Sequence, residues 1–112
     1  MDASSYQPPK HFPDLTRAGK IAVDCETRDP NLLTKGPGGV RRDGYIVGVS
    51  VATDDGFAEY YPVRHEAGGN LNPQNVFDWL RDQLKTDIPK VGANLPYDME
   101  WLLTENVKLG GL

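Results

Sequence analysis

The chain has 112 residues, a length typical of one domain, and its 38% hydrophobic and 25% charged content is that of a soluble globular protein. Its 16 acidic and 12 basic residues give a net charge of −4, which argues against a protein that holds nucleic acid through a broad cationic face, although not against a nuclease that reaches phosphate through bound metal. No apolar stretch approaches membrane-spanning length, the start lacks the apolar core of a secretory signal, and the single cysteine, Cys25, excludes an internal disulfide. We therefore expect a cytoplasmic protein in which Cys25 is a small buried side chain.

The chain begins with a segment that contains Pro8, Pro9 and Pro13. Residues 1–19 are expected to form a loosely packed leader, with Phe12 and Leu15 as its anchors. The folded domain is then expected to cover residues 20–112, starting with an apolar strand at residues 20–25.

A long connection follows at residues 28–44 and is rich in Gly and Pro. A structureless loop of this length inside a compact domain is usually functional or mobile. Its Arg41 and Arg42 are candidates for contacts with phosphate, although such pairs are more often solvated. The glycines are not followed by Gly-Lys-Ser/Thr, so the loop is not a nucleotide-phosphate loop.

Two more strands are expected at residues 45–53 and 57–63, joined by a hairpin turn at Asp54, Asp55 and Gly56. Helices are expected at residues 73–85 and 96–105, with a short strand at residues 90–93 between them. Asn72 and Asn94 stand where helix caps are expected. Five side chains of the two helices are expected to pack into the core: Trp79, Met99, Trp101, Leu102 and Leu103.

The element order predicts an α/β fold built on a mixed sheet. Three strands linked by short antiparallel connections are followed by a helix, a strand and a helix. A strand that is reached through a helix usually pairs in parallel by a right-handed crossover. If this fourth strand lies beside the first, the residues that follow both strands meet at one edge of the sheet.

An acidic triplet ends the first strand. Asp24 and Glu26 flank Cys25, and because residues two apart in a strand share a face, the two carboxylates are expected to lie side by side. Hard divalent ions such as Mg²⁺ or Mn²⁺ prefer oxygen ligands, so the triplet is a candidate half of a metal site. The alternative is that Asp24 caps the following loop and Glu26 is merely solvated.

A second group of polar residues follows the fourth strand. Asn94, Tyr97 and Asp98 open the last helix, where a capping amide and an anion are also favoured for purely structural reasons. A helix start alone does not account for Tyr97, nor for the meeting of this turn with Asp24 and Glu26. The combination favours a metal site over separate structural roles.

These residues carry a family resemblance. Ile-Ala-Val-Asp-Cys-Glu-Thr at residues 21–27 resembles the first motif of the DnaQ-like 3′-to-5′ exonucleases, and Val-Gly-Ala-Asn-Leu-Pro-Tyr-Asp at residues 91–98 resembles the second. The segments between them, at residues 46–50 and 61–71, resemble the proofreading domain of family A DNA polymerases, particularly phage versions. The resemblance covers about residues 12–112 and implies the N-terminal part of a ribonuclease H-like fold.

The resemblance also implies roles for individual residues. Asp24 and Glu26 match direct metal ligands, and Asp98 matches a ligand of a second metal ion. Thr27, Asn94 and Tyr97 match positions that contact the 3′-terminal nucleotide. The implied reaction uses two Mg²⁺ or Mn²⁺ ions to hydrolyse phosphodiester bonds at single-stranded or frayed DNA 3′ ends, releasing nucleoside 5′-monophosphates.

The chain departs from the family at the third motif, a Tyr-x-x-x-Asp on a later helix that supplies another carboxylate. No such motif follows Asp98, and neither Glu100 nor Glu105 is expected to replace it. His65 does not match the histidine base of other branches and is expected to shape the edge of the fold. We therefore expect the chain alone to bind Mn²⁺ weakly and to degrade DNA poorly or not at all.

Three alternatives remain open at this point. The site is completed by a polymerase region or a second polypeptide, or the chain is a catalytically incomplete module that binds single-stranded DNA or a replication protein. An exoribonuclease is a further alternative within the enzyme class, because the same two motifs occur there.

Overall fold

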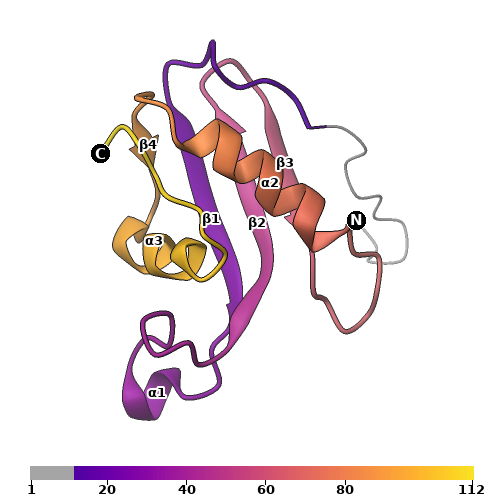
Figure 1. The fold of residues 1–112 in the computed structure, drawn as a ribbon, viewed down its shortest axis with the longest axis vertical. Coiled ribbons are helices and arrows are strands. Elements are labelled where there is room, and N and C mark those ends of the chain that lie inside the picture. The colour runs from indigo at the N-terminus through magenta and orange to yellow at the C-terminus, as the bar shows by residue number, and fades with distance from the viewer. Residues whose placement is uncertain (1–11) are drawn as a thin grey trace.

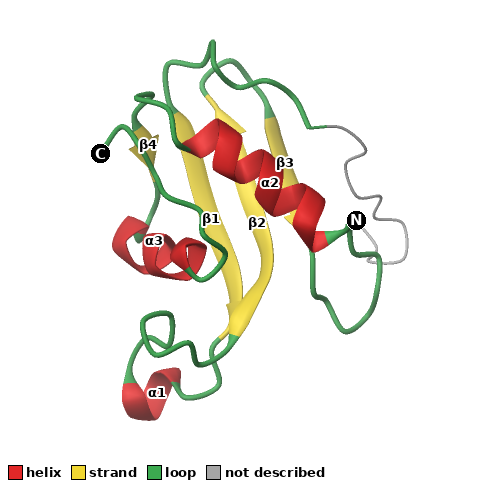
Figure 2. Cartoon of the chain, viewed as in Figure 1, coloured by secondary structure: helices red, strands yellow, loops and turns green. Residues whose placement is uncertain are grey.

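The computed structural model describes residues 12–112 and contains a four-stranded mixed sheet. Its strands are β1 (Ile21–Arg28), β2 (Tyr45–Thr53), β3 (Ala58–Pro62) and β4 (Lys90–Val91), in the spatial order β3-β2-β1-β4 (Figure 2). β1, β2 and β3 pair antiparallel, and β4 pairs with β1 in parallel. The predicted α/β fold and the predicted place of the fourth strand beside the first are both confirmed.

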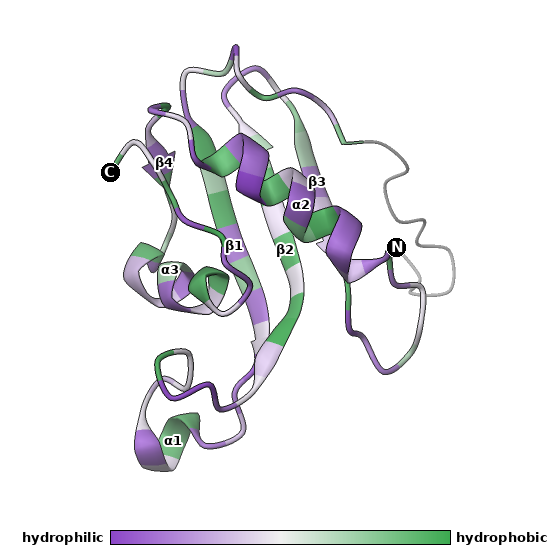
Figure 3. Cartoon of the chain, viewed as in Figure 1, coloured by the Kyte–Doolittle hydropathy of each residue, from purple (hydrophilic) through white to green (hydrophobic). Residues whose placement is uncertain are grey.

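Two helices cover one face of this sheet. α2 (Pro73–Leu84) crosses the strands, and α3 (Leu95–Leu103) lies beside β1 and β4 (Figure 1). The side chain of Asn72 caps α2 by accepting hydrogen bonds from two backbone N–H groups of its first turn, as predicted. Hydrophobic and hydrophilic residues alternate around α2, which therefore turns one apolar stripe to the sheet (Figure 3).

The core lies between the sheet and the helices because the strands alternate. Val23 and Cys25 of β1 are buried on the helix side, whereas Asp24 and Glu26 are exposed on the other side. The largest fully buried side chains come from the strands and from both helices: Ile21, Ile46, Tyr61, Phe77, Leu80, Leu84, Trp101 and Leu102. Trp79 is 8% exposed, so both tryptophans pack as predicted.

Several element boundaries differ from the prediction. β1 extends to Arg28 because it stays paired with β2 up to Tyr45. α3 covers only the edge of the sheet, so Leu103 is 41% exposed and Met99 is half-buried, and the prediction that both are core residues was wrong. The turn at Gly56, which has a φ of 100°, joins β2 to β3 as predicted.

The connection between β1 and β2 is held by polar contacts and contains the one-turn helix α1 (Leu32–Lys35). Oδ2 of Asp29 accepts the backbone N–H of Gly38 at 3.0 Å. The guanidinium of Arg41 donates to three carbonyl groups of the same loop and pairs with Asp43 at 3.2 Å. The prediction of a structureless loop was therefore wrong, and Arg41 serves the conformation of the loop.

The described part of the predicted leader packs onto the domain. Leu15 is 5% exposed, and the ring of Phe12 stacks on Tyr61 with 5.7 Å between centroids. Both predicted anchors thus contact the core, and residues 1–11 of the leader lie outside the described residues. In the part of the chain that the structure describes, no helix has the length and apolarity needed to cross a membrane.

Candidate active site

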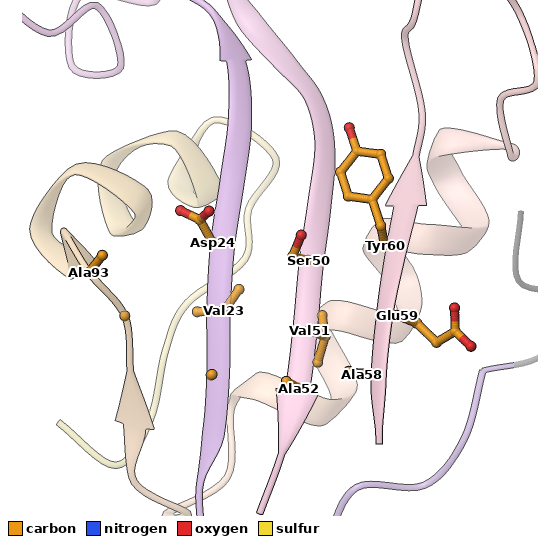
Figure 4. A pocket seen from close by; sticks show the side chains of 11 residues that line it. Val23, Asp24, Ser50, Val51, Ala52, Ala58, Glu59, Tyr60 and Ala93 are labelled. Carbon is orange, nitrogen blue, oxygen red and sulfur yellow. The ribbon is translucent and has the colours of Figure 1, made fainter. Parts of the chain in front are cut away.

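The two carboxylates of the acidic triplet lie on the sheet face opposite the helices. Asp24 stands opposite Ser50 of β2, and Ser50 stands opposite Tyr60 of β3, so the three form one row across the sheet (Figure 4). An open pocket of about 470 Å³ lies over this row and is also lined by Gly92 and Ala93, which follow β4. The triplet and the residues after the fourth strand therefore share one surface.

Asp98 reaches this place because β4 is short. β4 pairs with β1 only at Ile21 and Ala22, so the N–H of Cys25, further along the same edge, has no strand partner. The first turn of α3 fills the gap, and Oδ1 of Asp98 accepts that N–H at 3.1 Å. A side chain thus replaces the missing strand, and the third predicted carboxylate arrives at the backbone between Asp24 and Glu26.

The environment of Asp98 is unfavourable for its own negative charge. Its side chain is 1% exposed, and burial raises the pKa of the carboxyl group above its ordinary value; the N–H of Cys25 acts against this, and the charge of Asp24 adds to it. Oδ2 of Asp98 is buried without a hydrogen-bond partner among residues 12–112. A buried acceptor without a partner costs free energy, and a cation that reached Oδ2 would remove that cost.

Gly92 permits this close packing between α3 and β1. A Cβ atom at Gly92 would lie 2.8 Å from the carbonyl oxygen of Val23 and 3.7 Å from Oδ2 of Asp98. The first distance is shorter than real Cβ atoms adopt, and the backbone of β1 has no room to yield. β4 ends at Val91, immediately before this glycine and two residues before its predicted end.

The structure also brings together two of the three residues predicted to contact substrate. The hydroxyl groups of Thr27 and Tyr97 lie 3.0 Å apart, and Tyr97 donates to Oδ2 of Asp29 at 3.1 Å. Asn94 occupies the N-cap position of α3 but makes no side-chain cap hydrogen bond, so the predicted capping role was wrong and its amide is exposed. Asp29, which joins the loop to Tyr97, was missed by sequence reasoning because no local pattern marks it.

Two residues outside the motifs contact Glu26. Tyr60 donates to Oε2 of Glu26 at 2.8 Å, and its oxygen lies 2.6 Å from Nε2 of His65. No motif marks these contacts, and the only signal for them is the strand alternation that puts Tyr60 on the same face as Asp24. Glu100 and Glu105 do not join the site: Glu105 pairs with Arg64 at 2.8 Å, and Glu100 packs beside Gly39.

The three carboxylates suit a hard divalent ion, but they do not surround a ready-made binding position. All three side chains, Asp24, Glu26 and Asp98, offer carboxylate oxygens, which are the ligands that Mg²⁺ and Mn²⁺ prefer. Within residues 12–112, however, no group of three His, Cys, Asp or Glu side chains is close enough to form a ready metal cluster. The arrangement is an open, acidic strand edge at which Oδ2 of Asp98 is buried and unpaired.

Cys25 is expected to react slowly with alkylating agents as long as the chain is folded. Its side chain is 9% exposed, and burial raises the pKa of the thiol, with the charges of Asp98 and Asp24 adding to the shift. The thiolate is the reactive form, so iodoacetamide at about pH 8 should modify Cys25 at least ~10-fold faster after unfolding in denaturant, as measured by mass spectrometry. Equal rates in both states would contradict this placement.

The comparisons with known proteins agree with this geometry. No protein-family model matches the chain. A DNA-directed DNA polymerase of Pseudomonas phage M6 is 47% identical over 101 residues, which are 87% of this chain and 15% of that protein. The DNA polymerase DpoZ of Acinetobacter phage SH-Ab 15497 is 26% identical over 98 residues, which are 88% of this chain and 13% of that protein. The chain therefore spans only a small part of the relatives that it matches.

Solved structures show the same fold. The crystal structure of the EXD2 exonuclease domain soaked in Mg and GMP has a TM-score of 0.52 at 20% identity, over 87% of this chain and 43% of that one. A second crystal structure of the EXD2 exonuclease domain gives a TM-score of 0.51 at 20% identity, over 87% of this chain and 44% of that one. The resemblance predicted from residues 21–27 and 91–98 is confirmed at this level. The chain is homologous to a segment of phage DNA polymerases and has an exonuclease-like, ribonuclease H-like α/β fold.

Proposed function

We propose that this chain is part of the 3′-to-5′ exonuclease domain of a phage DNA polymerase, in which Asp24, Glu26 and Asp98 hold Mg²⁺ or Mn²⁺. The observation that carries the proposal is the position of Asp98, which binds the N–H of Cys25 and keeps Oδ2 buried and unpaired. Most buried side-chain oxygens have a hydrogen-bond partner, so an unpaired oxygen next to the two carboxylates of the triplet supports a cation there. The soaking of a structurally similar exonuclease domain in Mg and GMP supports the same choice of ligand.

In this proposal the chain's own residues hold and orient the end of a DNA strand. When bound, the divalent ions would supply a water activated for attack and charge stabilisation for the departing 3′-oxygen. Thr27 and Tyr97, already joined through their hydroxyl groups, would position the terminal nucleotide together with the exposed amide of Asn94. Residues 20–112 would form this part of the domain, acting on single-stranded or frayed DNA 3′ ends in the host cytoplasm.

The proposal includes a partner for the site. The described residues do not close a metal cluster, and the chain spans 15% of its phage M6 relative. We propose that a further carboxylate comes from the rest of a polymerase or from a second chain. The 112 residues alone are then expected to bind Mn²⁺ weakly, and to hydrolyse DNA slowly or not at all.

The test combines metal binding with DNA degradation. Mn²⁺ binding is measured by calorimetric titration, and 3′-end shortening is measured on a 5′-labelled single-stranded oligonucleotide and on its RNA counterpart. Asp24→Asn should abolish Mn²⁺ binding, whereas Glu59→Gln, a matched control whose carboxylate points away from Asp24 in Figure 4, should leave it unchanged. The site assignment fails if Mn²⁺ binding does not depend on Asp24.

The same experiment separates the alternatives. Robust shortening of DNA that disappears in Asp24→Asn would show that the chain alone is complete and would overturn the expectation of slow hydrolysis. DNA binding that is insensitive both to Asp24→Asn and to a chelator would favour a binding module. Shortening of RNA but not DNA would favour an exoribonuclease, since the 2′-hydroxyl distinguishes the two substrates.

A further inference from the structure

We propose that Tyr60 and His65 form a positioning pair that holds Glu26 in place for the metal ion. Neither residue belongs to the acidic triplet or to the segment at residues 91–98, and neither is a proposed ligand. The inference rests on the proposed function, because it assigns these residues a role toward the proposed metal site. Three observations support it: the hydrogen bonds of Tyr60, the space left by Gly48, and the backbone hydrogen bonds that hold the loop of His65.

The hydrogen bonds run in one direction. An ionised carboxylate only accepts, so the hydroxyl of Tyr60 donates its single proton to Oε2 of Glu26, at 2.8 Å. The Tyr60 oxygen must then accept from the nitrogen 2.6 Å away, which assigns the proton of His65 to Nε2. The two rings meet edge-on with 5.7 Å between centroids. The order of donation is His65 to Tyr60 to Glu26.

A glycine makes room for this arrangement. Gly48 lies directly opposite Glu26 in the ladder of β1 and β2. A Cβ atom at Gly48 would lie 2.0 Å from the hydroxyl oxygen of Tyr60 and 2.7 Å from Cε1 of its ring. The phenol therefore passes over the one residue of β2 that has no side chain, and Figure 4 shows Tyr60 pointing from β3 toward β2. The side chain of any other residue would block this path.

The backbone around His65 is fixed independently of the site. The ladder between β1 and β2 shifts between Glu26 and Thr27, so that Val47 has no partner opposite it in β1. On the other edge of β2, the carbonyl of Val47 accepts the N–H groups of Val63 and Arg64, at 2.9 and 3.0 Å. These two hydrogen bonds tie the end of β3 to β2 immediately before His65.

Asn70 completes the support of this loop. Its Oδ1 accepts the backbone N–H of His65 at 2.7 Å, and its Nδ2 donates to the carbonyl of His65 at 2.9 Å. The loop is thus closed on both sides of His65 before any metal binds. These hydrogen bonds fix the backbone of His65, and its imidazole contacts Tyr60 from that position. A histidine that was merely solvated would not need such support.

The contact with Tyr60 makes the two oxygens of Glu26 unequal. Tyr60 occupies Oε2, and the described residues donate no hydrogen bond to Oε1, which is left for a cation. Glutamate has a long, flexible side chain, and fixing it beforehand lowers the entropy cost of metal binding. Residues that orient a metal ligand in this way typically change metal affinity by about 10- to 100-fold when they are removed.

Tyr60→Phe tests the pair because it removes the hydroxyl and keeps the ring. The Kd for Mn²⁺, measured by calorimetric titration of the whole chain, should rise about 10-fold, with an unchanged melting temperature in chelator. Tyr45→Phe is the matched control, because Tyr45 is a half-exposed tyrosine on the same sheet. His65→Gln, which keeps an N–H donor, should retain more of the affinity than His65→Ala.

Gly48→Ala gives a second route to the same result. Its methyl group would displace the phenol, so its Kd for Mn²⁺ should rise as in Tyr60→Phe, and the double variant should lose no more than either single one. A Kd for Tyr60→Phe within about 2-fold of the wild type, with Asp24→Asn still unable to bind, would overturn the positioning pair and leave the proposed function intact. Absence of Asp24-dependent Mn²⁺ binding in the wild type would overturn both.

Discussion

Asp98→Asn is expected to raise the stability of the metal-free chain and to remove its response to metal. The substitution keeps an oxygen for the N–H of Cys25 and removes a negative charge from a site that is 1% exposed. Because burial disfavours the charged carboxylate and the amide is neutral, the expected gain in the free energy of unfolding is about 1 kcal/mol in chelator. Adding Mn²⁺ should stabilise the wild type and leave Asp98→Asn unchanged, as measured by thermal melting.

The pH dependence of this difference follows from the direction of the pKa shift. The pKa of Asp98 is raised above its ordinary value of 3.8, so the folded state binds the proton more tightly than the unfolded state. The wild type should therefore gain stability relative to Asp98→Asn as the pH falls through the folded pKa toward 3.8. A difference that stays constant from neutral pH down to this range would show that the charge of Asp98 is not the cause.

Trp101→Ala is expected to cause the largest loss of stability among single substitutions near the site. Trp101 is fully buried in α3 and meets the ring of Tyr97 edge-on at 6.3 Å. Truncation of a buried tryptophan typically costs about 3–5 kcal/mol, a large part of the roughly 5–15 kcal/mol that holds a domain together. Urea unfolding should show this loss, and Mn²⁺ binding should weaken with it because α3 carries Asp98.

Leu103→Ala on the same helix is the control. Leu103 is 41% exposed, so its truncation should change the free energy of unfolding by less than about 1 kcal/mol. Comparable losses for Leu103→Ala and Trp101→Ala would mean that α3 packs on the sheet with a different face. In that case Asp98 would not lie at the edge of β1.

Much of this fold was predictable because its signals are local. Alternating apolar residues mark β2, the Asp-Gly turn at Gly56 marks the hairpin, and Asn72 with Pro73 marks the start of α2. Right-handed crossover then places the fourth strand beside the first without further information. The meeting of Asp98 with the triplet follows from this topology, and for that reason it was foreseen.

The remaining parts of the site depend on contacts between distant residues. The contact from Tyr60 to Glu26 needs the register of two ladders, a bulge at Val47 and the missing side chain of Gly48. None of these leaves a local mark in the sequence. The same holds for the contact between Asp29 and Tyr97, which joins two segments that are 68 positions apart.

The start of α3 shows where local residue types fail to predict side-chain contacts. An asparagine before a proline is typical of a helix start, and Asn94 does stand at the N-cap of α3, yet its side chain makes no cap bond. Just before it, Gly92 packs so closely on the carbonyl of Val23 that a Cβ atom would not fit. A local preference for a cap position therefore does not determine what the side chain binds.

The central claim is that a divalent cation binds between the acidic triplet of β1 and Asp98. Anomalous diffraction from crystals soaked in Mn²⁺ locates that ion most directly. The expected result is an anomalous peak within ~2.0–2.6 Å of carboxylate oxygens of Asp24 and Asp98, absent in Asp98→Asn. A peak elsewhere, or none at this strand edge at a Mn²⁺ concentration well above the measured Kd, would contradict the assignment of these carboxylates to a metal site.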